Sequence, residues 1–199
     1  PEEGDEEIAP LIPEGSYQAI TINPTIGWFE KDIEAAADNK NVKAVRIHPE
    51  FHKFRLTDKC VTKLIDVLYE HKLPLIITSQ MEDPRSFHWT PQDTVPMQEL
   101  SAMIMHNKKI PVVFTNIPAG FWGSCEGMVK EYGNLNFDTS GIRFGVTDII
   151  EKAIINSKIP VENIVFGSQY PLFSREAVLN LFKMDPVSED ITEKILYKN

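Results

Sequence analysis

The sequence predicts an α/β fold, a TIM-type (β/α)8 barrel of which about six βα units are present in this chain. Short apolar, β-branched runs alternate six times with helical stretches, at the spacing of about 25 to 35 residues that a βα unit needs. No Gly-x-Gly-x-x-Gly and no Walker loop occurs, which weakens the alternative of an open, doubly wound sheet. Six units cannot close an eight-stranded barrel, so the first strands are expected to be missing.

Three predicted strands fill the amino-terminal half, each a short apolar run that ends in a polar turn: residues 18–22, 42–47 and 74–78. A helix is expected over 28–38. Pro49 argues against a helix directly after the second strand. The next helix is expected to open with Thr57 as its N-cap, followed by Asp58, which complements the helix dipole. Its inner face carries a stripe at i, i+3, i+4 and i+7, made of Val61, Leu64, Ile65 and Leu68.

The carboxyl-terminal half repeats the alternation. Strands are expected over 111–115, 134–137 (ending at Asp138) and 161–166, and helices over 97–106 and 121–132. Another helix is indicated by an apolar pattern at Val146, Ile149, Ile150, Ala153 and Ile154. Ser174 is predicted to cap a helix that reaches Met184, and Ser188 to cap a last helix that runs to the end of the chain.

Composition narrows the class of protein. The 199 residues carry a net charge of −9 and no basic run longer than Lys108-Lys109, which argues against a nucleic-acid partner. No run of 18 apolar residues predicts a membrane span. Two distant cysteines, Cys60 and Cys125, favour free thiols in the cytoplasm over a disulfide.

The predicted organisation is a single barrel domain over 1–199 with an acidic lead-in segment over 1–16. The chain begins at Pro1 and not at Met, so we expect it to be an internal segment of a longer protein.

The densest group of chemically useful side chains follows the third predicted strand, where Glu82, Asp83, Arg85 and His88 lie within seven residues. In α/β folds, the loops that leave strand carboxyl ends carry the chemistry. Arg85 is predicted to bind a substrate carboxylate in a bidentate manner, with Glu82 or Asp83 as a general base. The structural alternative is an ion pair that braces the long loop, because charged loop residues are commonly structural or solvated.

Four other polar residues are expected at strand ends. His48 follows the second strand and is predicted to line the substrate pocket. Asp138 points either into the barrel mouth, as a catalytic acid or base, or into a cap of the following loop. Asn116 and Gln169 are predicted to hydrogen-bond the substrate, and the equal alternative is a pair of buried amides satisfied by their neighbours.

Five short motifs follow one another at the predicted strand ends: Ile22-Asn23-Pro24-Thr25, Val45-Arg46-Ile47-His48-Pro49, Met81-Glu82-Asp83-Pro84-Arg85, Phe137-Asp138-Thr139-Ser140 and Phe166-Gly167-Ser168-Gln169-Tyr170-Pro171. In this order they resemble the amidohydrolase-related branch of the amidohydrolase superfamily, over about 17–199. The resemblance implies a (β/α)8 barrel. It also implies metal-dependent hydrolysis or decarboxylation of small organic acids, amides or lactones.

The resemblance also implies where metal ligands would stand, and this sequence departs from that pattern. Thr78 stands where the family's fifth strand offers a His, Asn116 approximately where the next strand offers another, and Gln169 replaces an Asp. Thr and neutral amides are poor donors for zinc or manganese. We therefore expect no metal ligands and no cofactor. A divalent metal such as zinc is expected only if the unseen first strand and substitute donors supply ligands.

The expected function is that of a hydrolase of C–N or lactone bonds, or of a decarboxylase. It would act on a small anionic organic substrate without the family's usual divalent metal. The main alternative is a catalytically inactive barrel that binds a small molecule or a protein partner. An intact His-x-His in the unseen first strand would favour metal chemistry, and its loss would favour the inactive barrel. A non-hydrolytic sugar-acid isomerase and a homodimer are further open alternatives.

Overall fold

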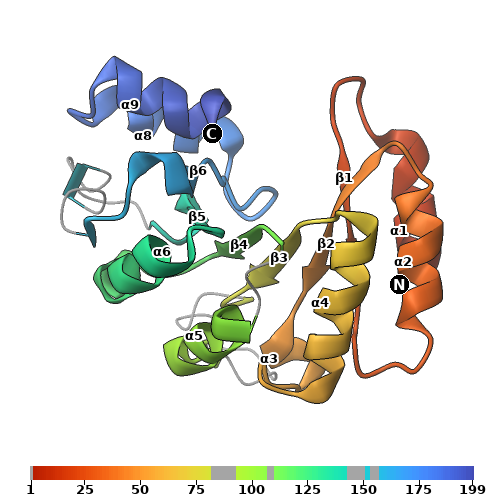
Figure 1. The fold of residues 1–199 in the computed structure, drawn as a ribbon. Helices are drawn as coiled ribbons and strands as arrows, with labels where there is room; N and C mark the ends of the chain where they lie inside the picture. Colours follow the sequence, from red (N-terminus) through yellow and green to blue (C-terminus); the bar gives the residue numbers. More distant parts are fainter. Residues whose placement is uncertain (1, 82–92, 107–109, 143–150, 153–156) are drawn as a thin grey trace. The chain divides into compact units, whose positions relative to one another are not determined.

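The strands of the sheet are neighbours in chain order, β1-β2-β3-β4-β5-β6 (Figure 1). The computed structural model describes residues 2–81, 93–106, 110–142, 151–152 and 157–199. Three pairs, β1/β2, β2/β3 and β5/β6, are parallel. A doubly wound sheet would reverse its strand order part-way along, so the observed order confirms the predicted barrel topology of six βα units. The strands are β1 (Gln18–Thr21), β2 (Val42–Ile47), β3 (Leu75–Thr78), β4 (Val112–Thr115), β5 (Leu135–Asp138) and β6 (Ile164–Val165).

Residue contacts divide the chain into two compact units, Pro1–Val113 and Phe114–Asn199. The helical segments of the first unit are α1 (Glu2–Ile8), η1 (Ala9–Leu11), α2 (Phe29–Ala37), α3 (Pro49–His52), α4 (Lys59–His71) and α5 (Met97–His106). The segment expected to be an acidic lead-in folds as α1 and η1, and Gln18 of β1 donates a side-chain hydrogen bond to the Asp5 carbonyl oxygen at 3.0 Å.

The first unit has its core between the strands and two amphipathic helices. Helix α2 packs against α4 and against β2 (Figure 1). The helices bury Ile33, Val61 and Leu64 completely, as the predicted stripe requires. Ile47 of β2 and Ile77 of β3 are also fully buried, as are Val45 and Leu75 two positions before them, so these four side chains belong to the core.

Two local expectations around α3 and α4 are wrong. Asp58, and not Thr57, is the N-cap of α4, and its carboxylate accepts a hydrogen bond from the Arg55 backbone N–H at 2.8 Å. A one-turn helix, α3, does follow β2 and begins at Pro49. Proline is compatible with the first helical turn because the N–H that it lacks would have no partner there.

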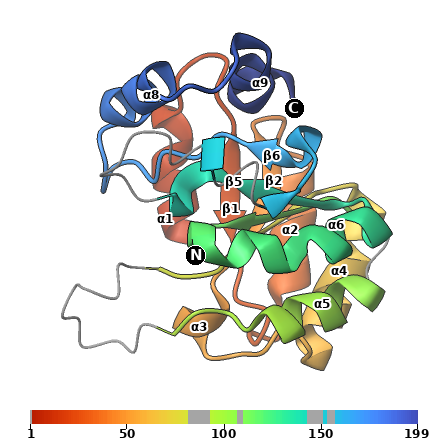
Figure 2. The ribbon, with the colours of Figure 1, turned by 90° about the vertical axis from the view of Figure 1, so that its left-hand side faces the viewer.

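The second unit contains η2 (Ala119–Cys125), α6 (Glu126–Tyr132), η3 (Thr139–Gly141), η4 (Val161–Asn163), α8 (Arg175–Met184), α9 (Glu189–Glu193) and the π-helical η5 (Lys194–Lys198). Helix α6 packs on β5 (Figure 2). Phe114, Trp122 and Phe137 are fully buried, and the Trp122 indole N–H donates to the Ile117 carbonyl oxygen at 3.2 Å. The predicted helix around 146–154 lies mostly outside the described residues.

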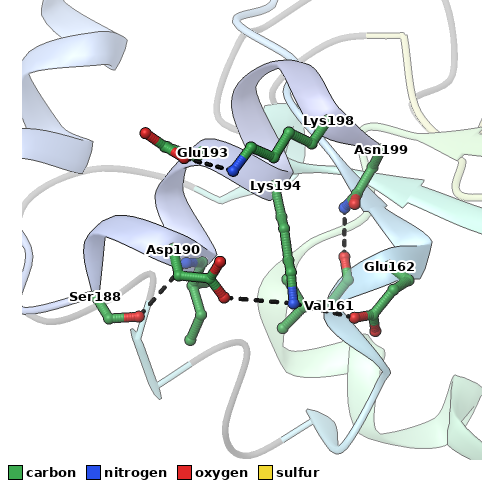
Figure 3. Close-up of polar contacts among 9 residues, drawn as sticks. Val161, Glu162, Ser188, Asp190, Glu193, Lys194, Lys198 and Asn199 are labelled. Atoms are coloured by element: carbon green, nitrogen blue, oxygen red, sulfur yellow. Dashed lines mark hydrogen bonds and ion pairs between the residues drawn. The ribbon is translucent and has the colours of Figure 1, made fainter.

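The carboxyl-terminal helices are fastened to the last strand region by polar contacts (Figure 3). Lys194 pairs with Glu162 at 3.3 Å and with Asp190 at 3.4 Å, and the Asn199 side chain donates to the Val161 carbonyl oxygen at 2.6 Å. Strand β6 is shorter than the predicted 161–166, because 161–163 form η4. The predicted caps are confirmed, since the Ser174 and Ser188 hydroxyls accept from backbone N–H groups of the helices they precede.

Cys60 and Cys125 are both free thiols in the structure, and Cys125 is buried. Burial raises the pKa of the Cys125 thiol to about 11, so it stays protonated near neutral pH. Within the described part of the chain, every helix is too short or too polar to cross a membrane.

Candidate functional site

Arg46, His48 and Thr78 form a polar group at the carboxyl ends of β2 and β3, which we call the β2–β3 cluster. The parallel register pairs Arg46 with Ile76 and Ile47 with Ile77, so His48 comes next to Thr78. Side chains alternate between the two faces of a strand. Because Ile47 and Ile77 are in the core, the side chains of the β2–β3 cluster share the opposite face.

His48 is neutral near pH 7. Burial, and then the nearby charges of Arg46 and His52, lower the pKa of His48 from its ordinary 6.5 to about 4. The rings of His48 and His52 lie edge to face with centroids 6.1 Å apart. A neutral imidazole beside a guanidinium can donate one hydrogen bond and accept another without adding charge.

Within the β2–β3 cluster, Nδ1 of His48 and Oγ1 of Thr78 are buried without a hydrogen-bond partner among the described residues. Thr78 is only 9% exposed. Buried polar atoms in native proteins nearly always have a partner, and an unsatisfied one costs free energy. The cluster is therefore suited to a ligand that supplies polar atoms.

Asp138 organises the second polar group, the Asp138 cluster, at the end of β5. Its Oδ1 accepts hydrogen bonds from the Asn116 N–H at 3.0 Å, from the Ser140 hydroxyl at 2.6 Å and from the Ser140 N–H at 3.3 Å. The Thr139 hydroxyl donates to the Gly167 carbonyl oxygen at 3.2 Å and accepts from the Gly167 N–H at 3.1 Å. The Asp138 carboxylate lies so close to Gly167 that a Cβ at that position would overlap with it.

Asn116 and Gln169 both have left-handed backbones, with φ of 59° and 55°. This conformation is uncommon for residues other than glycine and persists only where the surroundings hold it. The Asn116 N–H is held by the Asp138 carboxylate and the Ser140 hydroxyl. The Gln169 carbonyl oxygen accepts from the N–H groups of Leu172 and Phe173. Both predicted substrate-binding residues are thus at sharp, braced turns after β4 and β6.

The predicted site residues fall into three sets. His48 is in the β2–β3 cluster, and Asn116 and Asp138 are brought together in the Asp138 cluster. Gln169 follows β6 in the same unit as Asp138. Glu82, Asp83, Arg85 and His88 lie outside the described residues. The Asp138 geometry is that of the predicted loop cap, and its predicted acid–base role stays a prediction.

Sequence reasoning missed Arg46 and Ser140. Arg46 is a charged residue inside an otherwise apolar strand, two positions before His48, and that spacing placed it on the same face. This signal could have found it. Ser140 gave no comparable signal, because only the fold brings its hydroxyl to the Asn116 N–H at 3.0 Å.

The described residues do not fit a metal ion on their own. No group of three or more His, Cys, Asp and Glu side chains converges anywhere in the described ranges. Thr78, Asn116 and Gln169 offer only neutral oxygen or amide atoms, which bind divalent transition metals poorly. No catalytic step through a metal is assigned to these residues.

A sequence model of the family described as "Amidohydrolase" matches residues 23–199. No curated protein sequence matches the chain. Among solved structures, 5-carboxyvanillate decarboxylase from Sphingomonas paucimobilis superposes with a TM-score of 0.70 at 14% identity, covering 97% of this chain and 68% of that chain. A 2,6-dihydroxybenzoate decarboxylase in complex with 2,6-dihydroxybenzoate gives a TM-score of 0.68 at 10% identity, covering 97% of this chain and 72% of that chain.

A third solved structure corrects the expectation that no cofactor is involved. The dihydroxybenzoic acid decarboxylase from Polaromonas sp. JS666 contains manganese and the inhibitor 2-nitroresorcinol. It gives a TM-score of 0.56 at 10% identity, covering 87% of this chain and 63% of that chain. A protein of this fold therefore carries a divalent metal, and the expectation of no cofactor was wrong, because it rested on ligand positions in only part of a barrel.

Proposed function

Because the chain belongs to the amidohydrolase family, whose model matches residues 23–199, we propose that it acts on a small organic acid. The proposed reaction is either decarboxylation or hydrolysis of a C–N or lactone bond. Two of the solved structures similar to this chain are decarboxylases of substituted benzoic acids, which supports a carboxylic acid as the substrate.

The observation that carries this proposal is the pair of buried, unsatisfied atoms in the β2–β3 cluster. Nδ1 of His48 and Oγ1 of Thr78 have no partner among the described residues. They lie at the carboxyl ends of parallel strands, where barrel enzymes bind their substrates. A substrate that supplies polar atoms to both would remove the cost of leaving them unpaired.

Roles are also proposed for the other predicted residues, each within its own part of the chain. Asp138, Glu82 and Asp83 are the proposed acid–base residues, and Arg85, Asn116 and Gln169 the proposed substrate-binding residues. For Asp138, the hydrogen bonds to Oδ1 support a fixed carboxylate orientation, which acid–base work requires. A cytoplasmic location is also proposed, and the free thiols of Cys60 and Cys125 support it.

The second candidate is a barrel that binds a small molecule and catalyses nothing. It is favoured by the replacement of usual metal-ligand types by Thr78, Asn116 and Gln169. Both candidates predict ligand binding, and only the first predicts turnover.

The test is a turnover assay of the protein with hydroxybenzoic acids, the corresponding amides and aromatic lactones, each with and without added manganese. Carbon dioxide release and product formation are followed by chromatography. We expect turnover of at least one compound and a loss of activity of about tenfold in His48→Gln, the size of one lost hydrogen bond to the substrate. Binding without turnover of any compound would favour the second candidate and contradict the first.

A further inference from the structure

The β2–β3 cluster combines one fixed positive charge with two uncharged polar side chains. Arg46 is protonated at every physiological pH, whereas His48 is neutral because burial lowers its pKa to about 4. Thr78 contributes a hydroxyl. The group as a whole therefore attracts an anion that can accept several hydrogen bonds.

The three side chains are close enough to act on one small group. Arg46 and His48 are two residues apart on one face of β2, and the charge of Arg46 affects the titration of His48. Thr78 lies beside His48 on the neighbouring strand, because the parallel register pairs the preceding residues, Ile47 and Ile77. Neighbouring strands are about 4.8 Å apart. A carboxylate, whose two oxygens are about 2.2 Å apart by ordinary bond geometry, would therefore reach side chains of both strands from the carboxyl ends of β2 and β3.

The shape of the Arg46 guanidinium suits a carboxylate. Arg46 interacts with other groups of the chain. It also carries five N–H donors in a planar fork that matches the two oxygens of a carboxylate. The hydroxyl of Thr78 and a ring N–H of His48 can each donate to an oxygen that the fork leaves unfilled.

We propose that Arg46, His48 and Thr78 form a carboxylate-binding subsite in which Arg46 holds the negative charge and Thr78 donates a hydrogen bond. This deepens the proposed function and rests on it only for the identity of the substrate. It places the charge-binding group on β2, whereas the sequence alone pointed to Arg85. At Thr78, where the motif resemblance implies an imidazole, the proposed subsite uses a hydroxyl that donates to the substrate.

The experiment measures binding of benzoate to the protein by titration calorimetry, with benzamide as the uncharged isostere and inorganic phosphate as a competing anion. The test variants are Arg46→Gln, Arg46→Lys and Thr78→Val. The matched control is Lys43→Gln, which removes the same charge from an exposed position of the same strand. Circular dichroism of each variant checks that it is folded.

We expect Arg46→Gln to weaken benzoate binding about 10- to 100-fold, the range of a lost charge-assisted hydrogen bond. The benzoate affinity of Arg46→Lys is expected to lie between those of the wild type and Arg46→Gln, because lysine keeps the positive charge but lacks the planar pair of N–H donors. Thr78→Val should weaken binding about fivefold, and Lys43→Gln should leave it unchanged. Benzamide is expected to bind more weakly than benzoate.

Equal affinity of the wild type and Arg46→Gln for benzoate, or equal affinity for benzamide and benzoate, would overturn the subsite. If Arg46→Gln does not fold, unchanged binding in Thr78→Val overturns it. Displacement of benzoate by phosphate at equal concentration would show a general anion site and overturn the carboxylate assignment. If benzoate binding depends on Arg46 but no compound is turned over, the subsite stands and the proposed enzymatic function is wrong. If a compound is turned over but benzoate binding does not depend on Arg46, the enzymatic function stands and the subsite is wrong.

Discussion

The backbone N–H of Asn116 donates a hydrogen bond to Asp138 Oδ1 at 3.0 Å, which joins the turn after β4 to the end of β5. The same oxygen accepts from the hydroxyl and the N–H of Ser140. One carboxylate oxygen thus fixes a left-handed turn and the start of η3 together. Asp138 holds this part of the unit in place whether or not it also takes part in catalysis.

Asp138→Ala is expected to lower the free energy of unfolding by about 2 to 4 kcal/mol, because buried N–H donors lose a charged acceptor. Ser140→Ala removes one of the donors and should cost about 1 kcal/mol. Urea denaturation measures both. Asp138→Asn keeps the shape and is the variant for the turnover assay. If it stays folded but loses turnover, the acid–base role is supported. A stability of Asp138→Ala equal to that of the wild type would contradict the bracing role.

Gly167→Ala should destabilise the protein by about 1 to 3 kcal/mol, since the added Cβ would overlap with the Asp138 carboxylate. Gly127 in α6 provides the control, because a Cβ there meets nothing within 4 Å. Gly127→Ala is expected to stabilise the helix by about 0.5 to 1 kcal/mol. Thermal unfolding of the two variants should therefore move in opposite directions, and a common direction would refute the close approach.

Elements with a strong local signal were predictable from the sequence. Helix α5 has the predicted bounds, Met97–His106, and Ser174 caps α8 as expected, because apolar periodicity and capping chemistry are encoded in neighbouring residues. The one-turn helix α3 was missed because Pro49 was interpreted as a helix breaker, although it occupies a position where proline is favourable.

Candidate site residues were predictable from the sequence only where they directly follow or end a predicted strand. His48 and Asp138 were found because each follows an apolar run. The pairing of His48 with Thr78 depends on strand register, and the bond between Asn116 and Asp138 joins residues 22 apart in the chain. Such partners are set by the fold and not by local sequence. The motif resemblance implied metal-dependent chemistry, but the donor types at Thr78, Asn116 and Gln169 argued against a metal, and only the comparison with a manganese-containing structure corrected that expectation.

His48 predicts a pH dependence of stability. Its pKa is about 4 in the folded protein and 6.5 ordinarily, so between these values the unfolded chain binds a proton that the folded chain does not. The contribution of neutral His48 to the free energy of unfolding is therefore fully present above pH 6.5, and it is lost as the pH decreases toward 4. Because the ring is partly exposed, we expect a loss of about 1 kcal/mol between pH 7.5 and pH 5.

Urea denaturation of the wild type and of His48→Gln at the two pH values tests this dependence. The variant should lose less stability than the wild type on acidification. Burial lowers the pKa of His52 as well, so His52→Gln measures the second contribution. Equal losses in the wild type and in both variants would show that neither imidazole is responsible.

Thr78→Val should stabilise the ligand-free protein by about 0.5 to 1 kcal/mol. Its Oγ1 is buried without a partner among the described residues, and valine replaces the hydroxyl by a methyl group of the same shape. Thr139→Val is the matched control. Thr139 is 2% exposed, and its hydroxyl both donates to and accepts from the Gly167 backbone, so its loss should cost about 1 to 3 kcal/mol.

Urea denaturation without ligand measures both variants. If Thr78 serves ligand binding at a cost in stability, Thr78→Val should raise the free energy of unfolding and Thr139→Val should lower it. Thr78→Val should also bind benzoate more weakly. Destabilisation by both would mean that the Thr78 hydroxyl already has a structural partner.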